Sequence, residues 1–156
     1  MKYIYFIFLL LLTNTIFANS FTVEVFETQF DDKKSTLNEQ TKWVFFTSSK
    51  DGSEILKESF KELKIDQNWM EDKKIVYVAD IHEMPSLIAR FIALPRMRDY
   101  PYNIALDREG IITKNWQDKT EQVTLYKVDN LKILEVFKLN DTKDVNQFFT
   151  KTLNKK

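Results

Sequence analysis

The hydrophobic pattern at the start of the chain differs from the pattern of the rest. Residues 3–12 are apolar and uncharged, and they follow a single basic residue, Lys2. Such a run falls short of the roughly 20 residues of a transmembrane helix and has the length of a signal-peptide core. Ala18 and Ser20 place small residues where a signal peptidase reads them. The pattern predicts a cleavable signal peptide over residues 1–20, cut after Ser20 or, as the alternative, after Ala18. An uncleaved membrane anchor is the competing interpretation.

Apolar runs and alternations beyond this segment predict the strands of one α/β domain over residues 21–156. Residues 21–26 alternate between apolar and polar side chains, as a strand with one solvated face does. Residues 43–46 and 75–79 are continuously apolar, which is typical of strands buried on both faces in the middle of a sheet. Further strands are expected over residues 102–106, 123–128 and 131–139, the last two as an antiparallel hairpin.

Helical periodicity between the expected strands predicts three helices. Asp51 and Glu54 have capping-box spacing at the start of the first helix, whose apolar residues fall close to one face. Pro85 opens the second helix, which should stop before Pro95 because proline disfavours helical backbone in the residue before it. One of residues 141–142 can cap the third helix. The resulting order, β-β-α-β-α-β-β-β-α, indicates an α/β domain that ends in a hairpin and a helix.

The composition excludes several classes of function. The chain has 23 Lys and Arg residues and 23 Asp and Glu residues, so it lacks the basic field that nucleic-acid binding needs. No nucleic-acid partner is therefore expected, and cleavage of the signal peptide would leave no stable membrane anchor. The chain also has no cysteine, so its stability has to come from a core rich in aromatic residues rather than from disulfides.

Residues 43–63 resemble the central strand, active-site turn and first long helix of thioredoxin-like proteins, and residues 48–51 lie where that family carries its paired cysteines. Residues 99–110 look like the proline, strand and turn that follow, with Pro101 in the place of the family's cis-proline. The resemblance implies a thioredoxin-like fold, with a central mixed sheet flanked by helices, and a cis bond between Tyr100 and Pro101. Because a cysteine thiolate performs the redox chemistry of this fold, we expect the chain to be redox-inactive and assign no catalytic residue.

Residues 79–90 and 94–101 also resemble a group of small exported bacterial proteins of unassigned function, close to the YtfJ-type periplasmic proteins. Some members of that group carry the label of an FAD/FMN-containing dehydrogenase. Dinucleotide binding by the common route needs a glycine-rich turn between a strand and a helix. The chain has 2 glycines, Gly52 and Gly110, and they are too far apart to form such a turn. No cofactor is therefore expected.

Candidate residues for hydrolysis or metal binding are sparse. Ser48 or Ser49 with His82 and Asp80 supplies the residue types of a hydrolase triad, but no glycines flank the serines as in a nucleophile elbow. The favoured interpretation makes the serines turn and capping residues and His82 a loop residue. With 1 histidine and no cysteine, no metal site is expected.

Arginine is confined to one part of the chain. Arg90, Arg96, Arg98 and Arg108 are its only arginines, and no lysine lies between the first and the last of them. A guanidinium suits a site where a planar donor has to bind a carboxylate or a phosphate. The cluster therefore either binds a ligand or pairs with nearby carboxylates and orders the loop before Pro101. The candidate internal partners are Asp80, Glu83 and Asp99.

These patterns favour an exported, redox-inactive binding or accessory protein that holds a peptide or protein partner on the Pro101 face. The alternatives are an enzyme of unassigned type, which would use Arg and Asp groups near Pro101, and a structural component of the cell envelope. In a Gram-negative bacterium the exported protein would be periplasmic. The expected binding residues are Ser48, Ser49, Asp51, Arg96, Arg98, Asp99, Tyr100 and Pro101.

The signal-peptide interpretation predicts the mass of the exported protein. Intact-mass measurement after export is expected to give an N-terminus at Phe21, or at Asn19 for the alternative cleavage. A protein that keeps Met1 and stays in the membrane fraction would contradict the interpretation.

Overall fold

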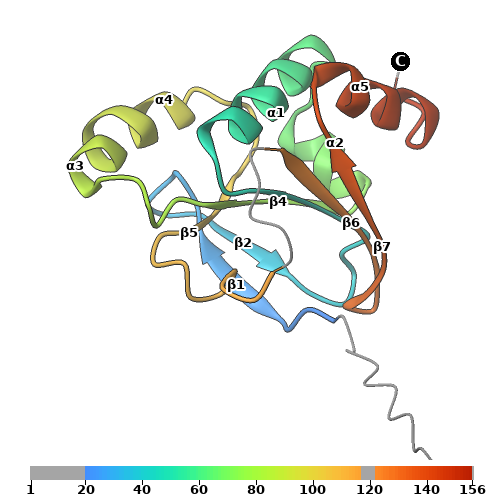
Figure 1. Cartoon of the computed structure of the whole chain (residues 1–156), viewed down its shortest axis with the longest axis horizontal. Helices are drawn as coiled ribbons and strands as arrows, with labels where there is room; N and C mark the ends of the chain where they lie inside the picture. Colours follow the sequence, from blue (N-terminus) through green and yellow to red (C-terminus); the bar gives the residue numbers. More distant parts are fainter. Residues whose placement is uncertain (1–19, 117–121, 156) are drawn as a thin grey trace, which may run out of the picture.

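A seven-stranded mixed sheet forms the centre of the computed structural model, which describes residues 20–116 and 122–155 (Figure 1). The predicted signal peptide, apart from Ser20, lies outside the described residues. Across the sheet the strands lie in the order β2-β1-β5-β4-β3-β6-β7. The neighbours β3 and β4 are parallel, as are β4 and β5, and the other pairs are antiparallel. The strands are β1 (Glu24–Glu27), β2 (Lys34–Leu37), β3 (Trp43–Thr47), β4 (Ile75–Asp80), β5 (Ala105–Asp107), β6 (Val123–Asp129) and β7 (Lys132–Leu139).

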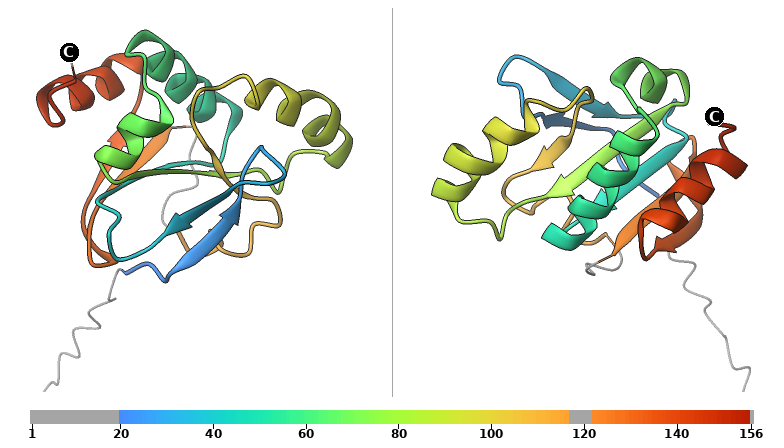
Figure 2. Two further views of the ribbon diagram at one scale, coloured as in Figure 1. Left: turned by 180° about the vertical axis from the view of Figure 1, so that it is seen from behind. Right: turned by 90° about the horizontal axis from the view of Figure 1, so that it is seen from above.

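The helices of the described part gather on one face of the sheet, and the β1–β2 hairpin curls beneath the opposite face (Figures 1 and 2). A continuous helical segment between β4 and β5 contains a π-helical stretch, η1, flanked by two short α-helices. The helices are α1 (Lys50–Glu62), α2 (Gln67–Asp72), α3 (Ser86–Ile88), η1 (Ala89–Ala93), α4 (Leu94–Met97) and α5 (Thr142–Lys151).

Aromatic side chains fill the core between the sheet and the helices. Phe45 of β3 stacks on Phe149 of α5 with ring centroids 5.4 Å apart, and Phe60 of α1 meets Phe149 edge to face at 5.5 Å. Val44 and Phe46, the chain neighbours of Phe45, belong to the second core on the opposite face of the sheet. Successive side chains of a strand point to opposite faces, so a strand with a core on both sides has to be apolar throughout. The prediction for residues 43–46 is confirmed in this respect.

Two elements are absent from the sequence-based prediction. The strand β2 is a short, mostly polar edge strand in which only Leu37 is buried. The helix α2 is capped by Asp66, which accepts a hydrogen bond from the Trp69 backbone N–H at 2.8 Å, and only Met70 is buried in it. Each element has one buried residue, so neither produces a hydrophobic period. Pairing with β1 decides the structure of β2, and packing against β4 on the helix-covered face decides that of α2.

Two details of the helix predictions are wrong. Ser49, not Asp51, caps α1, because Ser49 has extended backbone and its Oγ accepts a hydrogen bond from the Gly52 N–H at 3.0 Å. The helix before β5 also continues through Pro95. The π-helical turn η1 ends at Ala93, two residues before the proline, and such a turn changes the hydrogen-bond register where a proline lacks its N–H. In contrast, Asp141 caps α5 as one of the two predicted residues, and the hairpin over β6 and β7 is confirmed.

A buried glutamine ties β1 to the loop before β5. The Gln29 side chain, with the residue 0% exposed, donates from Nε2 to the carbonyl oxygen of Tyr102 at 2.7 Å and to that of Met97 at 3.2 Å. Its Oε1 accepts from the backbone N–H of Ile104 at 2.9 Å. One amide therefore satisfies three backbone groups between the last residue of α4 and the residue before β5.

Replacing Gln29 with Leu is expected to destabilise the protein by about 3 kcal/mol, or roughly 10 °C in melting temperature. Leucine has a similar volume but leaves buried backbone groups without partners. Thermal unfolding followed by circular dichroism measures the effect. Gln147→Leu, on the exposed face of α5, is the matched control and is expected to leave the melting temperature unchanged. Equal melting curves for Gln29→Leu and the unsubstituted protein would show that the amide does not hold the loop.

Candidate functional site

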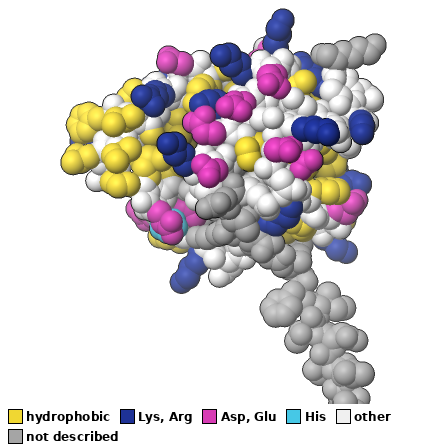
Figure 3. Space-filling view, turned by 45° about the horizontal axis from the view of Figure 1, so that its top comes forward, with side chains coloured by type: hydrophobic (Ala, Val, Ile, Leu, Met, Phe, Trp, Pro, Cys, Tyr) yellow, Lys and Arg dark blue, Asp and Glu magenta, His cyan; other side chains and the backbone are white. Residues whose placement is uncertain are grey.

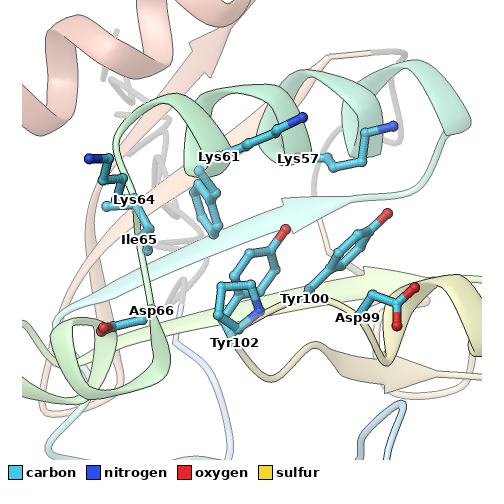
Figure 4. Close-up of a pocket in the computed structure, with 10 residues that line it drawn as sticks. Lys57, Lys61, Lys64, Ile65, Asp66, Asp99, Tyr100 and Tyr102 are labelled. Atoms are coloured by element: carbon cyan, nitrogen blue, oxygen red, sulfur yellow. The ribbon is translucent and has the colours of Figure 1, made fainter.

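A groove of about 600 Å³ lies between α1 and the loop that leads into β5 (Figure 4). We call it the α1 groove. It is lined by Lys57, Phe60, Lys61, Lys64, Ile65, Asp66, Asp99, Tyr100, Pro101 and Tyr102.

Two tyrosines form the aromatic wall of the α1 groove. The rings of Tyr100 and Tyr102 are stacked with centroids 5.5 Å apart and planes 27° apart, and Tyr102 also meets Phe60 edge to face at 4.9 Å. Both tyrosine hydroxyls point toward α1 (Figure 4). Burial raises the pKa of both hydroxyls above the ordinary value. They are therefore neutral groups at physiological pH and can donate hydrogen bonds.

Lysines from α1 and the turn after it form the opposite wall. Lys57 and Lys61 are four residues apart on one side of α1, and Lys64 follows in the turn after the helix. Lys57 pairs with Glu54, and this hydrogen bond is the main cause of its raised pKa. Lys61 and Lys64 have no ion-pair partner among the described residues, so their ammonium groups remain available to a ligand.

The carboxylates of the α1 groove are unequal. Asp66 is engaged, since its Oδ1 caps α2. Asp99 has no side-chain partner in the described part of the chain, and it lies on the tyrosine side of the α1 groove (Figure 4). The α1 groove therefore presents free positive charge on one side, free negative charge on the other and aromatic surface between them.

The structure brings only part of the predicted binding residues together. Asp99, Tyr100 and Pro101 line the α1 groove. The predicted residues Ser48, Ser49, Asp51, Arg96 and Arg98 do not line it. Ser48 and Ser49 precede α1, and Asp51 lies exposed in the first turn of that helix.

The arginines mostly make internal contacts, with partners other than those predicted. Arg98 donates from Nε to the carbonyl oxygen of Gln29 at 2.9 Å and from one terminal nitrogen to both carboxylate oxygens of Asp31, at 3.1 and 3.2 Å. Arg108 pairs with Glu27 at 3.3 Å. The loop-ordering interpretation is therefore correct for Arg98, but its partners come from the end of β1 rather than from Asp80, Glu83 or Asp99. Arg96 is exposed and has no ion-pair partner among the described residues.

Ser48, Ser49, Asp80 and His82 do not form a hydrolase triad. His82 pairs with Asp80 through Nδ1 at 2.6 Å, and Thr113 Oγ1 lies within hydrogen-bond distance of both Asp80 (2.9 Å) and Asp107 (3.0 Å). No described serine is hydrogen-bonded to His82. The imidazole instead packs against Gly110, where an added Cβ would lie 2.6 Å from the ring. His82 thus has a structural position in the loop after β4.

Searches for related proteins point to the fold through structure rather than sequence. No family model and no curated protein matches the chain. The pneumococcal exposed lipoprotein thioredoxin from Streptococcus pneumoniae is similar with a TM-score of 0.58 and 13% identity, over 83% of this chain and 99% of that one. The thioredoxin domain of a thiol-disulfide oxidoreductase from Bacteroides vulgatus is similar with a TM-score of 0.55 and 15% identity, over 88% and 97%. StoA from Bacillus subtilis is similar with a TM-score of 0.54 and 13% identity, over 81% and 96%.

The chain has a thioredoxin-like fold. The identities of 13–15% establish the fold alone. In this thioredoxin-like domain Ser48 and Ser49 follow β3 and lead into α1, which is where the resemblance placed the missing cysteines. Among the described residues there is also no group of three His, Asp or Glu side chains that could hold a metal, and no helix long and apolar enough to cross a membrane.

The predicted cis bond at Pro101 and its predicted place facing the start of α1 are wrong. The described residues contain no cis peptide bond, so the Tyr100–Pro101 bond is trans, and Pro101 is exposed. The strand that follows it, β5, pairs with β4 and β1 rather than with β3. The strand antiparallel to β3 is β6, and the carbonyl oxygen of Gln122, just before it, would lie 2.9 Å from a Cβ added to Gly52. Gln122, not Pro101, therefore lies against the start of α1.

Sequence reasoning missed the lysine wall of the α1 groove. The spacing of Lys57, Lys61 and Lys64 on a predicted helix was visible, but lysines on one face of a helix usually mean a solvated surface. The sequence pattern predicts Tyr102 only as part of a strand. Nothing in the local pattern indicates that the loop before β5 returns to face α1.

Replacing Arg98 with Lys is expected to lower the melting temperature by roughly 3 °C, because a lysine cannot bind the Asp31 carboxylate and the Gln29 carbonyl at once. Arg96→Lys is the matched control and is expected to have no effect. Differential scanning calorimetry of both variants measures the difference. An unchanged melting temperature for Arg98→Lys would return this arginine to the set of candidate ligand-binding residues.

Proposed function

We propose that this chain is an exported, redox-inactive thioredoxin-like binding protein whose ligand site is the α1 groove. The observation that carries the proposal is the combination of two ammonium groups that have no ion-pair partner in the described part of the chain, those of Lys61 and Lys64, with the stacked rings of Tyr100 and Tyr102. Ligand pockets typically combine apolar and aromatic surface with a few polar groups that set orientation.

The side chains around the start of α1 support binding rather than catalysis. Ser49 Oγ accepts from the Gly52 N–H, and Ser53 Oγ donates to the Ser49 carbonyl oxygen at 3.0 Å. Thr47 Oγ1 lies 3.1 Å from the hydroxyls of both Ser53 and Tyr77. These hydroxyls are engaged with one another and with the backbone, and none contacts a histidine that could act as a base. Without a thiolate, the position that serves redox chemistry in this fold becomes a helix cap.

The chemistry of the α1 groove favours a peptide segment that contains an acidic residue beside an aromatic or large aliphatic one. The carboxylate would pair with Lys61 or Lys64, and the apolar side chain would lie on the tyrosine rings. Asp99, on the opposite side, would accept a hydrogen bond from the peptide or pair with a basic residue. The backbone at Pro101 cannot form a full strand-like pair with the ligand, because proline has no N–H and the Pro101 carbonyl oxygen already accepts from the Gln67 N–H at 2.8 Å. Recognition therefore depends on side chains.

Export is part of the proposal. It rests on the apolar run over residues 3–12, the small residues at 18 and 20, and the expected resemblance of residues 79–90 and 94–101 to a group of small exported proteins of unassigned function near the YtfJ-type proteins. The similar pneumococcal protein is described as an exposed lipoprotein, which agrees with such a location.

Selection from a library of random peptides displayed on phage is expected to enrich peptides with Asp or Glu next to Phe, Tyr, Trp or Leu. A synthetic copy of the most enriched peptide should bind at least about ten-fold more weakly to Lys61→Glu, because the substitution reverses the charge that meets the carboxylate. Tyr100→Ala should weaken binding to a similar extent. Isothermal titration calorimetry measures both affinities.

Lys143→Glu, on the exposed face of α5, makes the same charge change away from the α1 groove and is expected to keep full affinity. Thermal melts of all variants show whether each remains folded. Equal losses of peptide affinity for Lys61→Glu and Lys143→Glu would show that the affinity depends on the net charge of the protein and not on the position of Lys61. A selected peptide that binds all variants equally well would place the ligand site elsewhere.

A further inference from the structure

The helical segment over residues 86–97, which contains α3, η1 and α4, exposes large apolar side chains. Leu87 is 70% exposed, Phe91 66%, Ile92 47% and Ile88 44%. We call these four residues the apolar patch. Their spacing along the helix places them on one side, and hydrophobic side chains cover this end of the molecule in Figure 3. Monomeric soluble proteins rarely expose a contiguous apolar surface of this kind without a partner for it.

The apolar patch is not needed to hold its own helix in place. Leu94 is buried, while Ala89, Ala93 and Met97 are half-buried, so the inward side of the segment consists mainly of small residues and one leucine. The larger apolar residues point outward instead. A helix whose large apolar residues face solvent while its alanines face the protein has the pattern of a docking element rather than of a core helix.

The charges within the helical segment itself all have one sign. Residues 84–98 contain Arg90, Arg96 and Arg98 and no Asp or Glu, and the acidic residues Glu83 and Asp99 flank the segment at its two ends. Arg98 is neutralised by Asp31, but the Arg90 guanidinium lies over the Phe91 ring at 5.4 Å from its centroid, and Arg96 has no ion-pair partner among the described residues. Two cationic groups therefore border the four apolar side chains.

This combination selects among the surfaces that could cover the apolar patch. A second copy of the chain, placed symmetrically, would bring Arg90 and Arg96 of both copies close together, where like charges repel. The surface of an anionic phospholipid bilayer complements both features, since it offers phosphate oxygens at the level of the arginines and acyl chains beneath them. The apolar patch lies at the opposite end of the molecule from α5 (Figures 1 and 2), and its four side chains are already exposed.

We infer that residues 86–97 dock reversibly on the surface of a bilayer that contains anionic phospholipids. Leu87, Ile88, Phe91 and Ile92 enter the boundary between headgroups and acyl chains, while Arg90 and Arg96 contact the phosphates. The inference concerns a surface separate from the α1 groove and does not depend on the ligand proposed there.

The absence of cysteine from the chain makes a site-specific test direct, because a single introduced cysteine carries the only label. Leu87→Cys and, as the matched control, Val25→Cys on β1 (60% exposed) are labelled with the environment-sensitive dye nitrobenzoxadiazole. Each is titrated with vesicles of phosphatidylcholine alone or of phosphatidylcholine mixed with phosphatidylglycerol. The label reports only its own surroundings, so other contacts of the chain with lipid do not obscure the result.

The label at position 87 is expected to brighten several-fold and shift to the blue with the mixed vesicles, whereas the label at position 25 remains unchanged. Adding Arg90→Gln and Arg96→Gln should raise the lipid concentration at half-saturation by about five-fold for each arginine. Adding Phe91→Ser and Ile92→Ser should abolish the response without lowering the melting temperature, since both side chains are exposed.

Three outcomes would overturn the inference. In the first outcome, the fluorescence of the label at position 87 does not change with the mixed vesicles, which would favour a protein as the partner of the apolar patch. In the second, the fluorescence changes equally with vesicles of phosphatidylcholine alone, which would show that Arg90 and Arg96 do not select anionic lipid. In the third, the emission of the label changes with protein concentration in the absence of lipid, which would make the apolar patch a contact between copies of the chain.

Discussion

The fold around the α1 groove depends on the buried carboxamide of Gln29. Its three hydrogen bonds to the backbone at Met97, Tyr102 and Ile104 tie the segment between α4 and β5 to the end of β1. A buried backbone group without a partner destabilises a fold, so one amide that serves three such groups sets the path of the whole loop. Arg98 adds a second tie to the same strand end, through the Gln29 carbonyl and Asp31. These contacts hold Tyr100 and Tyr102 where they can face the lysines of α1.

The loss of cysteine changes what the start of α1 can do. In a thioredoxin-like fold this is the position of the reactive thiolate, and a helix N-terminus favours a negative charge there. In this chain Ser49 occupies the position as a cap, and the hydroxyls of Thr47, Ser53 and Tyr77 beneath it are engaged with one another. The hydroxyls at this position therefore stabilise the helix start. The ammonium groups without an ion-pair partner among the described residues lie at the other end of α1, at Lys61 and, in the turn after the helix, at Lys64.

Several local predictions failed because a tertiary contact outweighed a local preference. Asp51 and Glu54 match a capping box, but the backbone turns at Ser49, and Glu54 pairs with Lys57 instead. Pro95 should end its helix, but a π-helical turn allows the segment to continue. Pro101 is expected to face the start of α1 because it precedes a strand. That strand, β5, pairs with β4 and β1 rather than with β3, so Pro101 lies elsewhere. A proline and an apolar run do not indicate which neighbour the strand will choose.

The sequence by itself determined the elements with a strong period or a continuous apolar run. The buried strands β3 and β4, the hairpin of β6 and β7, and the helix capped by Asp141 are readable because local hydrophobic order and capping chemistry act over a few residues. Because the sequence contains no cysteine, it also determines that the chain cannot perform thiol–disulfide exchange through a thiolate of its own. Only the tertiary structure decided which side chains meet. Lys61 and Tyr100 line the same groove, and Arg98 pairs with Asp31, although dozens of residues separate the members of each pair along the chain. Strand order and buried hydrogen bonds, rather than the local sequence pattern, bring these residues together.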